Sequence, residues 1–157
     1  MIISQTVRKL IVRLGITGSR SNTNFDFMPL FSYCIEEFNA FLKWEKITSI
    51  ITGGACGIDR QAEQCAVKLN FPCQIIRPDY VKYHKAAPLK RDLQIAAQCD
   101  ALLAVWNGDC SSRGTIYTAK SALKFRKPVF LIFSTGETIN ECIGEIRDER
   151  VFAVSKI

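Results

Sequence analysis

The sequence predicts an α/β protein with three layers, in which helices cover both faces of a mainly parallel sheet of five or six strands. Short apolar runs rich in β-branched residues alternate along the chain with longer segments whose apolar residues recur at helical spacing. The segment between one strand and the next is about as long as a crossover helix requires. At 157 residues, the chain is expected to form a single domain with a substantial core.

The expected strands are short and apolar. Residues 9–17 place an apolar side chain at every second position, and residues 100–106 form an almost unbroken apolar run, as in a central parallel strand. The remaining core strands and a last strand are expected at 47–52, 73–77, 128–133 and 151–154. Residues 1–8 are interpreted as either an extra edge strand or a loose leader.

Helices are expected between these strands. Asp26 and Pro29 bracket the start of the first helix, which should run to about residue 44 because aromatic and aliphatic residues recur there at helical spacing. The other helices are expected at about 57–70, 89–98 and 116–126. Residues 78–88 have no periodicity and a proline at each end, so we expect an irregular loop there.

Composition and charge narrow the class of protein. Hydrophobic residues make up 48% and charged residues 23%, which is typical of a globular protein. No apolar run approaches the roughly 20 residues that cross a bilayer, and three basic residues interrupt the first fifteen, so we expect a cytoplasmic protein without membrane contact. The net charge of +6 favours anionic partners. Since the basic residues form no continuous run, small phosphorylated ligands are favoured over nucleic acid.

The seven cysteines do not indicate a metal centre. No pair has CxxC spacing and the chain has one histidine, so neither a zinc site nor another cofactor is expected. Most of the cysteines lie in apolar patterns and are interpreted as small core residues. Cys56 and Cys110 differ because each lies in a predicted functional loop, but no second histidine is present to support a nucleophile.

Three turns that contain glycine follow predicted strands, at residues 18–20, 53–57 and 111–115. In a parallel sheet these turns share the edge at the carboxyl ends of the strands, where ligands bind in such folds. Free N–H groups at a helix start attract anions, and the guanidinium of Arg20 can hold phosphate. Glycine after a strand also serves simply to make a tight turn, and this alternative stays open for each turn taken alone.

Polar and aromatic residues elsewhere on the same edge are candidates for the rest of a ligand. Base or ribose contacts are expected from Tyr80, Tyr83, His84, Lys85 and Asn107, with a plain crossing loop at 78–88 as the open alternative. Lys90 and Arg91 lie in the first turn of a predicted helix, where basic residues oppose the helix dipole. This conflict indicates that they serve a site and not the helix.

Five segments share their order and spacing with a known group of proteins. They read GITGSR (15–20), ITGGACGIDRQAE (51–63), RPDY (77–80), HKAAPLKRDLQIAAQCDALLAVWNG (84–108) and SSRGT (111–115). These segments resemble the SLOG superfamily, which groups the DprA (SMF) and LOG ("lonely guy") proteins, and within it the small YspA-like group. The resemblance covers roughly residues 14–133.

The resemblance implies a Rossmann-like fold that binds nucleotides or nucleotide derivatives, and a homo-oligomer. By motif position it implies that ligand contacts come from Gly18, Ser19, Arg20, Gly53, Gly54, Asp59, Arg91, Ser112, Gly114 and Thr115. Asp92 stands where the family usually carries an asparagine. SLOG domains resemble sensors of ADP-ribose-like or cyclic nucleotide signals in bacterial conflict systems, so we expect a stand-alone sensor, or a sequestering sponge of the kind a phage would encode.

One departure from the family pattern bears on catalysis. The LOG phosphoribohydrolases carry PGGxGTxxE, whose glutamate serves cleavage of the N-glycosidic bond, whereas the matching segment here is SSRGTIYT with Thr118 at that position. A threonine is no general base at neutral pH without activation. A nucleotide N-glycosidase remains the alternative, with Asp59, Asp79, Asp92 or Asp109 as substitutes and no catalytic residue assigned. A third, weaker hypothesis is single-stranded DNA binding in the manner of DprA, which only the net charge suggests.

Overall fold

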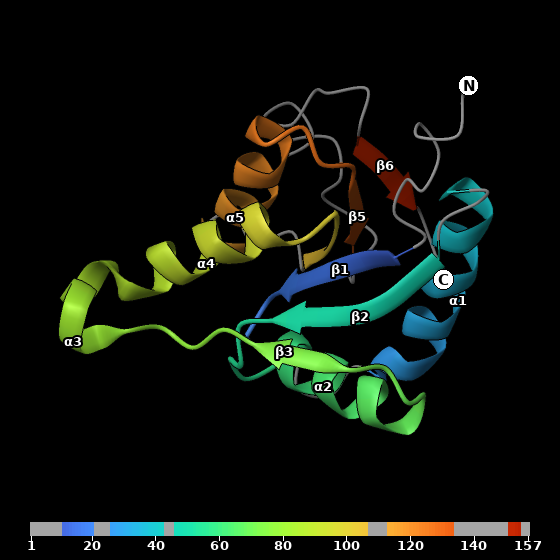
Figure 1. Ribbon diagram of the computed structural model, residues 1–157, viewed down its shortest axis with the longest axis horizontal. Coiled ribbons are helices and arrows are strands. Elements are labelled where there is room, and N and C mark those ends of the chain that lie inside the picture. Colours follow the sequence, from blue (N-terminus) through green and yellow to red (C-terminus); the bar gives the residue numbers. More distant parts are fainter. Residues whose placement is uncertain (1–10, 21–25, 43–45, 107–112, 134–150, 155–157) are drawn as a thin grey trace, which may run out of the picture.

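The computed structural model describes residues 11–20, 26–42, 46–106, 113–133 and 151–154 (Figure 1). Strands and helices alternate through most of this part of the chain. The elements are β1 (Ile11–Gly18), α1 (Phe27–Leu42), β2 (Lys46–Thr52), α2 (Ile58–Lys68), β3 (Cys73–Ile75), α3 (Tyr80–Tyr83), the 3-10 turn η1 (His84–Ala86), α4 (Ala87–Gln98), β4 (Ala101–Trp106), α5 (Arg113–Lys124), β5 (Val129–Phe133) and β6 (Val151–Val154).

The described strands form one sheet in the order β3-β2-β1-β4-β5-β6, and every pair of neighbours is parallel. This is the strand order of a doubly wound Rossmann-like fold, in which the direction of winding reverses between β1 and β4. The α/β class, the parallel sheet and the sixth strand predicted from the sequence are therefore confirmed. The carboxyl ends of β1, β2 and β3 point toward the side of the molecule where α3 lies (Figure 1).

Two apolar layers separate the sheet from its helices, and β4 contributes to both. Ala101, Leu103 and Val105 belong to the cluster that packs against α1 and α2, whereas the alternate residues Leu102 and Ala104 belong to the cluster beneath α4 and α5. Because successive strand residues point to opposite faces, a central strand must be apolar throughout. The unbroken apolar run of β4 is thus a consequence of its central place in a three-layer sandwich.

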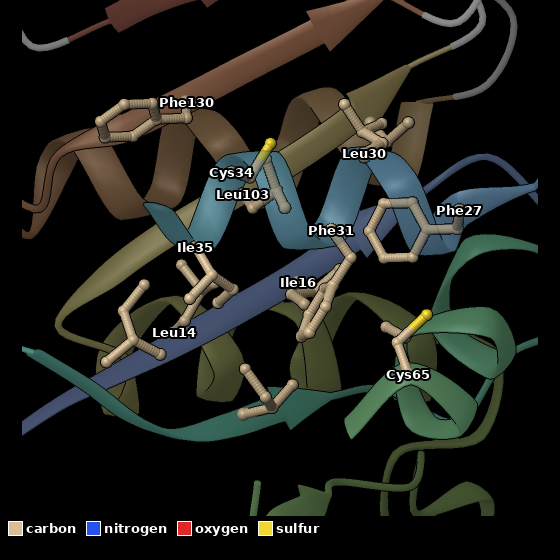
Figure 2. Close-up of a cluster of buried hydrophobic side chains, with 14 of the residues drawn as sticks. Leu14, Ile16, Phe27, Leu30, Phe31, Cys34, Ile35, Cys65, Leu103 and Phe130 are labelled. Carbon is tan, nitrogen blue, oxygen red and sulfur yellow. The ribbon is translucent and has the colours of Figure 1, made fainter. Parts of the chain in front are cut away.

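Aromatic side chains of α1 fill the cluster on the first face (Figure 2). Phe27 and Phe31 are almost fully buried, and their ring centroids lie 5.7 Å apart at an interplanar angle of 58°. The side-chain amide oxygen of Gln61 on α2 accepts a hydrogen bond of 3.1 Å from the Phe27 N–H. This bond satisfies a free donor at the start of α1 and fixes that start against α2.

A pair of charged residues fixes β1 against β4 near the amino ends of these two strands. The Arg13 N–H and guanidinium Nε both donate to Oδ2 of Asp100, at 2.9 and 3.2 Å, and the Asp100 N–H donates to the Arg13 carbonyl at 2.8 Å. Since register in a parallel pair decides where the strands end, this contact helps set the relative heights of the loops that follow β1 and β4.

The structure differs from the sequence prediction at residues 78–88. This segment is not irregular, because Tyr80–Tyr83 and His84–Ala86 form short helices and α4 begins at Ala87, two residues earlier than expected. The Asp79 side chain caps α3 by accepting a 2.9 Å hydrogen bond from the Lys82 N–H. Residues 1–8, for which a strand or a leader was expected, and the expected end of the first helix at residue 44 lie outside the described residues.

Two further observations apply to the described residues. Their helices include none that is both long and apolar enough to cross a membrane. Their histidine, cysteine and acidic side chains form no group of three or more that could hold a metal ion.

The core predicts a strong contrast between two truncations. Leu103→Ala removes a fully buried side chain from β4, and we expect it to lower the free energy of unfolding by about 2–5 kcal/mol. Val67→Ala removes a side chain of α2 that is 75% exposed, and it should change this free energy by less than about 0.5 kcal/mol. Urea unfolding followed by circular dichroism measures both, and equal losses would contradict the assigned core.

Candidate functional site

A pocket of about 370 Å³ opens at the carboxyl edge of the sheet. Its walls come from the segments that follow β1, β2 and β3 and from the start of α4. The lining residues are Arg20, Gly53, Gly54, Ala55, Cys56, Arg77, Pro78, Tyr80 and Arg91. Three of these nine are arginines, so the pocket is built to attract negative charge.

Residues 53–57, here called the glycine loop, form the centre of this wall. Gly54 and Gly57 have φ angles of 68° and 80°, which side chains with a Cβ rarely adopt. Gly57 also lies against the main-chain carbonyls of Ser19 and Arg20, where an added Cβ would collide with both. The Ile58 N–H donates to the Ser19 carbonyl at 3.4 Å, so the turns after β1 and β2 pack directly on one another.

Two arginine side chains occupy the space that the first glycines of this loop leave free. The Arg91 guanidinium covers Gly53, and its Nη1 donates to the Gly53 carbonyl at 2.6 Å. The Arg77 guanidinium lies over Gly54, with Nη1 3.2 Å from the position that a Cβ on Gly54 would take. The glycines therefore permit a close approach of guanidinium groups to the backbone as well as a tight turn.

Arg91 is neutralised by buried carboxylates. Its Nε donates to Asp92 Oδ1 at 2.7 Å, and the two residues are only 6% and 7% exposed. Asp59, also 6% exposed, accepts a 3.3 Å hydrogen bond from the Ala55 N–H. Burial raises the pKa of Asp59 to about 6, although the Ala55 N–H and the charge of Arg91 oppose this rise. Burial also raises the pKa of Asp92, against the influence of Arg91 and Arg20.

The first turn of α5 packs beside the same acidic group. A Cβ added to Gly114 would lie 3.6 Å from Asp92 Oδ2, which is an ordinary contact. Thr118 is fully buried, and its hydroxyl donates to the Gly114 carbonyl at 2.8 Å. The residue that stands at the LOG glutamate position is therefore a buried threonine whose hydroxyl is hydrogen bonded within its own helix.

The structure sorts the predicted ligand-binding residues into three groups. Those that line the pocket are Arg20, Gly53, Gly54, Tyr80 and Arg91. Those that lie behind the wall or beside it are Gly18, Ser19, Asp59, Tyr83, His84, Lys85, Gly114 and Thr115. Ser112 and Asn107, together with Cys110, lie outside the described residues.

Residues behind the wall serve packing and hydrogen bonding in the described structure. Gly18 lies against the Ile58 side chain, where an added Cβ would be 2.5 Å from the Ile58 Cβ. The Ser19 N–H donates to the Val105 carbonyl of β4 at 3.1 Å, and Ser19 is 1% exposed. Thr115 is 3% exposed in the first turn of α5.

Sequence reasoning did not select Arg77 as a site residue, although it lines the pocket beside Gly54. A signal for it was present, because Arg77 comes two residues after the last residue of β3 and so must lie at the same edge as the glycine loop. Arg77 and Arg20 are both exposed, in contrast to the buried Arg91. Cys56, a lining residue that the sequence placed in a functional loop, is exposed with a free thiol.

Comparison with known proteins supports the fold. No family model matches the chain, and no curated protein matches it by sequence. Among solved structures, DNA processing protein A (DprA) from Streptococcus pneumoniae matches with a TM-score of 0.63 and 16% sequence identity. The match covers 93% of this chain and 59% of the DprA chain, so this chain spans less than two thirds of that protein. At this identity the likeness shows a shared fold.

Two glycine-to-alanine substitutions, one in the glycine loop and one in α5, should have opposite effects on stability. Gly57→Ala forces a Cβ into the Ser19 and Arg20 carbonyls at a positive φ, and it should lower the free energy of unfolding by about 2–4 kcal/mol. Gly114→Ala, in α5, meets only an ordinary contact with Asp92 Oδ2 of α4 and should raise this energy by up to about 1 kcal/mol. Thermal and urea unfolding measure both, and a neutral Gly57→Ala would show that the two turns do not pack as described.

The buried carboxyl of Asp59 predicts a dependence of stability on pH. Its pKa is raised in the folded protein, from 3.8 to about 6, so the folded state binds the proton more tightly than the unfolded state does. Stability contributed by this proton is present below pH 3.8 and is lost as the pH rises toward 6. Asp59→Asn should therefore raise the free energy of unfolding at pH 7.5 by on the order of 1–3 kcal/mol and flatten its decline between pH 4 and 6.

Urea unfolding across this pH range tests the expectation. Asp79→Asn is the matched control, because Asp79 is exposed and lies outside the buried group. A larger decline in the Asp59→Asn variant than in the original chain would contradict the assignment.

Proposed function

We propose that this chain binds a nucleotide-derived, phosphorylated small molecule in the pocket at the carboxyl edge of its sheet, as a sensor or a sequestering protein. One observation carries the proposal: arginines from three separate segments line a cavity of about 370 Å³ beside a loop of small residues. That volume is in the range of small-molecule sites. Phosphate suits such a group of arginines, because the planar fork of a guanidinium matches two phosphate oxygens.

The wall of the pocket also suits a planar group. Tyr80 lies at the start of α3, is 57% exposed and lines the cavity. An aromatic ring beside a cationic surface is suited to stack on a base while the phosphates meet the arginines. This arrangement supports a nucleotide over inorganic phosphate or a simple sugar phosphate.

The resemblance of the sequence segments to the SLOG superfamily and its YspA-like group points the same way. On that resemblance we propose an ADP-ribose-like or cyclic nucleotide signal as the ligand, a setting in anti-phage defence or its evasion by phage, and a homo-oligomeric, cytoplasmic protein. Binding without turnover is favoured because the Thr118 hydroxyl at the LOG glutamate position is buried and already hydrogen bonded.

A single observation favours the alternative of a nucleotide N-glycosidase. The pKa of Asp59 is raised by burial to about 6, in the range that suits a general acid or base, and its Ala55 partner lines the pocket. Incubation with ADP-ribose or AMP followed by chromatography separates the two functions. Recovery of unchanged ligand supports binding alone, whereas release of free base that is lost in Asp59→Asn supports the enzyme.

DNA is a further candidate ligand because the structural neighbour is named a DNA processing protein. The arginines of the pocket are compatible with a phosphate backbone as well as with a small molecule. A gel shift with single-stranded DNA that persists at 200 mM salt would favour DNA, whereas loss of the shift at that concentration would indicate non-specific attraction.

The proposal predicts tight binding that depends on Arg20. Calorimetric titration with ADP-ribose, cyclic ADP-ribose and cyclic dinucleotides should find at least one ligand with a dissociation constant well below 1 mM, and Arg20→Ala should weaken its binding about tenfold. Lys46→Ala is the matched control, because it removes one positive charge from an exposed residue that begins β2 at the opposite edge of the sheet. Binding no tighter than about 1 mM for all these ligands would count decisively against the proposal.

A further inference from the structure

We infer that Arg77 makes the pocket selective for nucleotide derivatives in which two phosphates are joined, as in a pyrophosphate bridge, over nucleotides that carry a single phosphate. The inference rests on the proposed function and names the class of ligand more narrowly. It starts from the unequal surroundings of the three arginines that line the cavity.

Arg91 has little charge to offer a ligand. Its guanidinium donates to the Gly53 carbonyl and to Asp92 Oδ1, at 2.6 and 2.7 Å, and its charge also acts on the buried Asp59. A buried guanidinium that faces two carboxyl groups is largely neutralised. Arg91 is therefore a positioning residue, which holds the glycine loop in place from α4.

Arg20 is partly compensated, because its charge lowers the pKa of Asp92 against the effect of burial. Arg77 differs from both, since within the described residues it has no carboxylate partner. The nearest acid in sequence is Asp79, and that side chain accepts the Lys82 N–H as the cap of α3. Arg77 thus holds the least compensated charge in the pocket.

The two exposed arginines follow the strands on either side of β2, so their segments flank the glycine loop. Arg77 follows β3 and lies over Gly54, whereas Arg20 follows β1 and its backbone lies against Gly57. A single phosphate must be shared between these two groups. Two linked phosphates give each guanidinium its own anionic group, and each such pair has the favourable geometry of a charged hydrogen bond.

The side chain of Arg77 is held in place by a contact that only glycine permits. A Cβ on Gly54 would lie 3.2 Å from Arg77 Nη1 and 2.8 Å from a methyl carbon of Ile75. The guanidinium therefore lies against the backbone of the loop, at the exposed rim of the pocket. A pre-positioned arginine loses less conformational entropy when it binds an anion, so this placement strengthens selectivity.

The test compares AMP with ADP-ribose. Above pH 7.5 the two molecules carry nearly the same charge, because the second pKa of a phosphate monoester is about 6. In AMP this charge lies on one phosphorus centre, and in ADP-ribose it is divided between two. A difference between their responses to a substitution therefore does not arise from the number of charges.

Calorimetry at pH 8 should show that Arg77→Ala weakens ADP-ribose binding about 10–100-fold and AMP binding less than about 3-fold. Arg77→Lys keeps the charge but loses the planar fork, so its loss for ADP-ribose should lie between those of the original chain and Arg77→Ala. Lys46→Ala should leave both affinities unchanged. Since Arg77 is exposed, its variants should unfold at the same temperature as the original chain.

The outcomes separate this inference from the proposed function. Equal weakening of AMP and ADP-ribose by Arg77→Ala, or no effect on either, overturns the inference and leaves nucleotide binding intact. Failure of the original chain to bind either ligand, or the cyclic nucleotides, more tightly than about 1 mM overturns both.

Discussion

The contact between the Arg91 guanidinium and the Gly53 carbonyl holds the carboxyl edge of this molecule together. Arg91 comes from α4, on one face of the sheet, and Gly53 begins the loop that leads into α2, on the other face. Few apolar contacts can reach across the end of a sheet, so a charged hydrogen bond takes their place. The buried carboxyl group of Asp92 makes this arrangement tolerable, because a guanidinium withdrawn from water without a counter-charge would be strongly destabilising. The shape of the pocket follows from this group.

Most of the fold could be predicted from the sequence because burial imposes a regular pattern on each element. β4 is apolar on both faces, which indicates a central strand. In α1, α2 and α5 apolar residues recur at helical spacing, which indicates helices that pack on a core. The prediction was wrong for α3, which has no buried residue and therefore no periodic signal. Its helical form depends on the Asp79 cap, a local hydrogen bond that the sequence prediction did not take into account.

The location of the site was predictable in the same way, since parallel strands bring the residues that follow them to one edge. The balance of charges within the pocket could not be predicted from the sequence. Arg91 and Asp92 are neighbours on a helix, where adjacent side chains normally diverge, and only the burial of both against the glycine loop turns them toward each other. The surplus charge of Arg77 is equally invisible in the sequence, because it depends on which carboxylates are already engaged by other groups. Which carboxylates pair with which arginines can be determined only from the tertiary contacts.

The order of the strands has a consequence for how the protein acquires its pocket. Within the described part of the chain, every lining residue comes from the first 91 positions, before β4 begins. Yet α4, which supplies Arg91, packs on an apolar layer built from β4, β5 and α5. In addition, β1 pairs with β4, whose partner residues lie nearly 90 positions later in the chain. Pairings between distant segments form slowly. A nascent chain that already contains these described lining residues would therefore still lack the pocket, and the ability to bind a ligand would emerge late, when the second half of the sheet packs against the first.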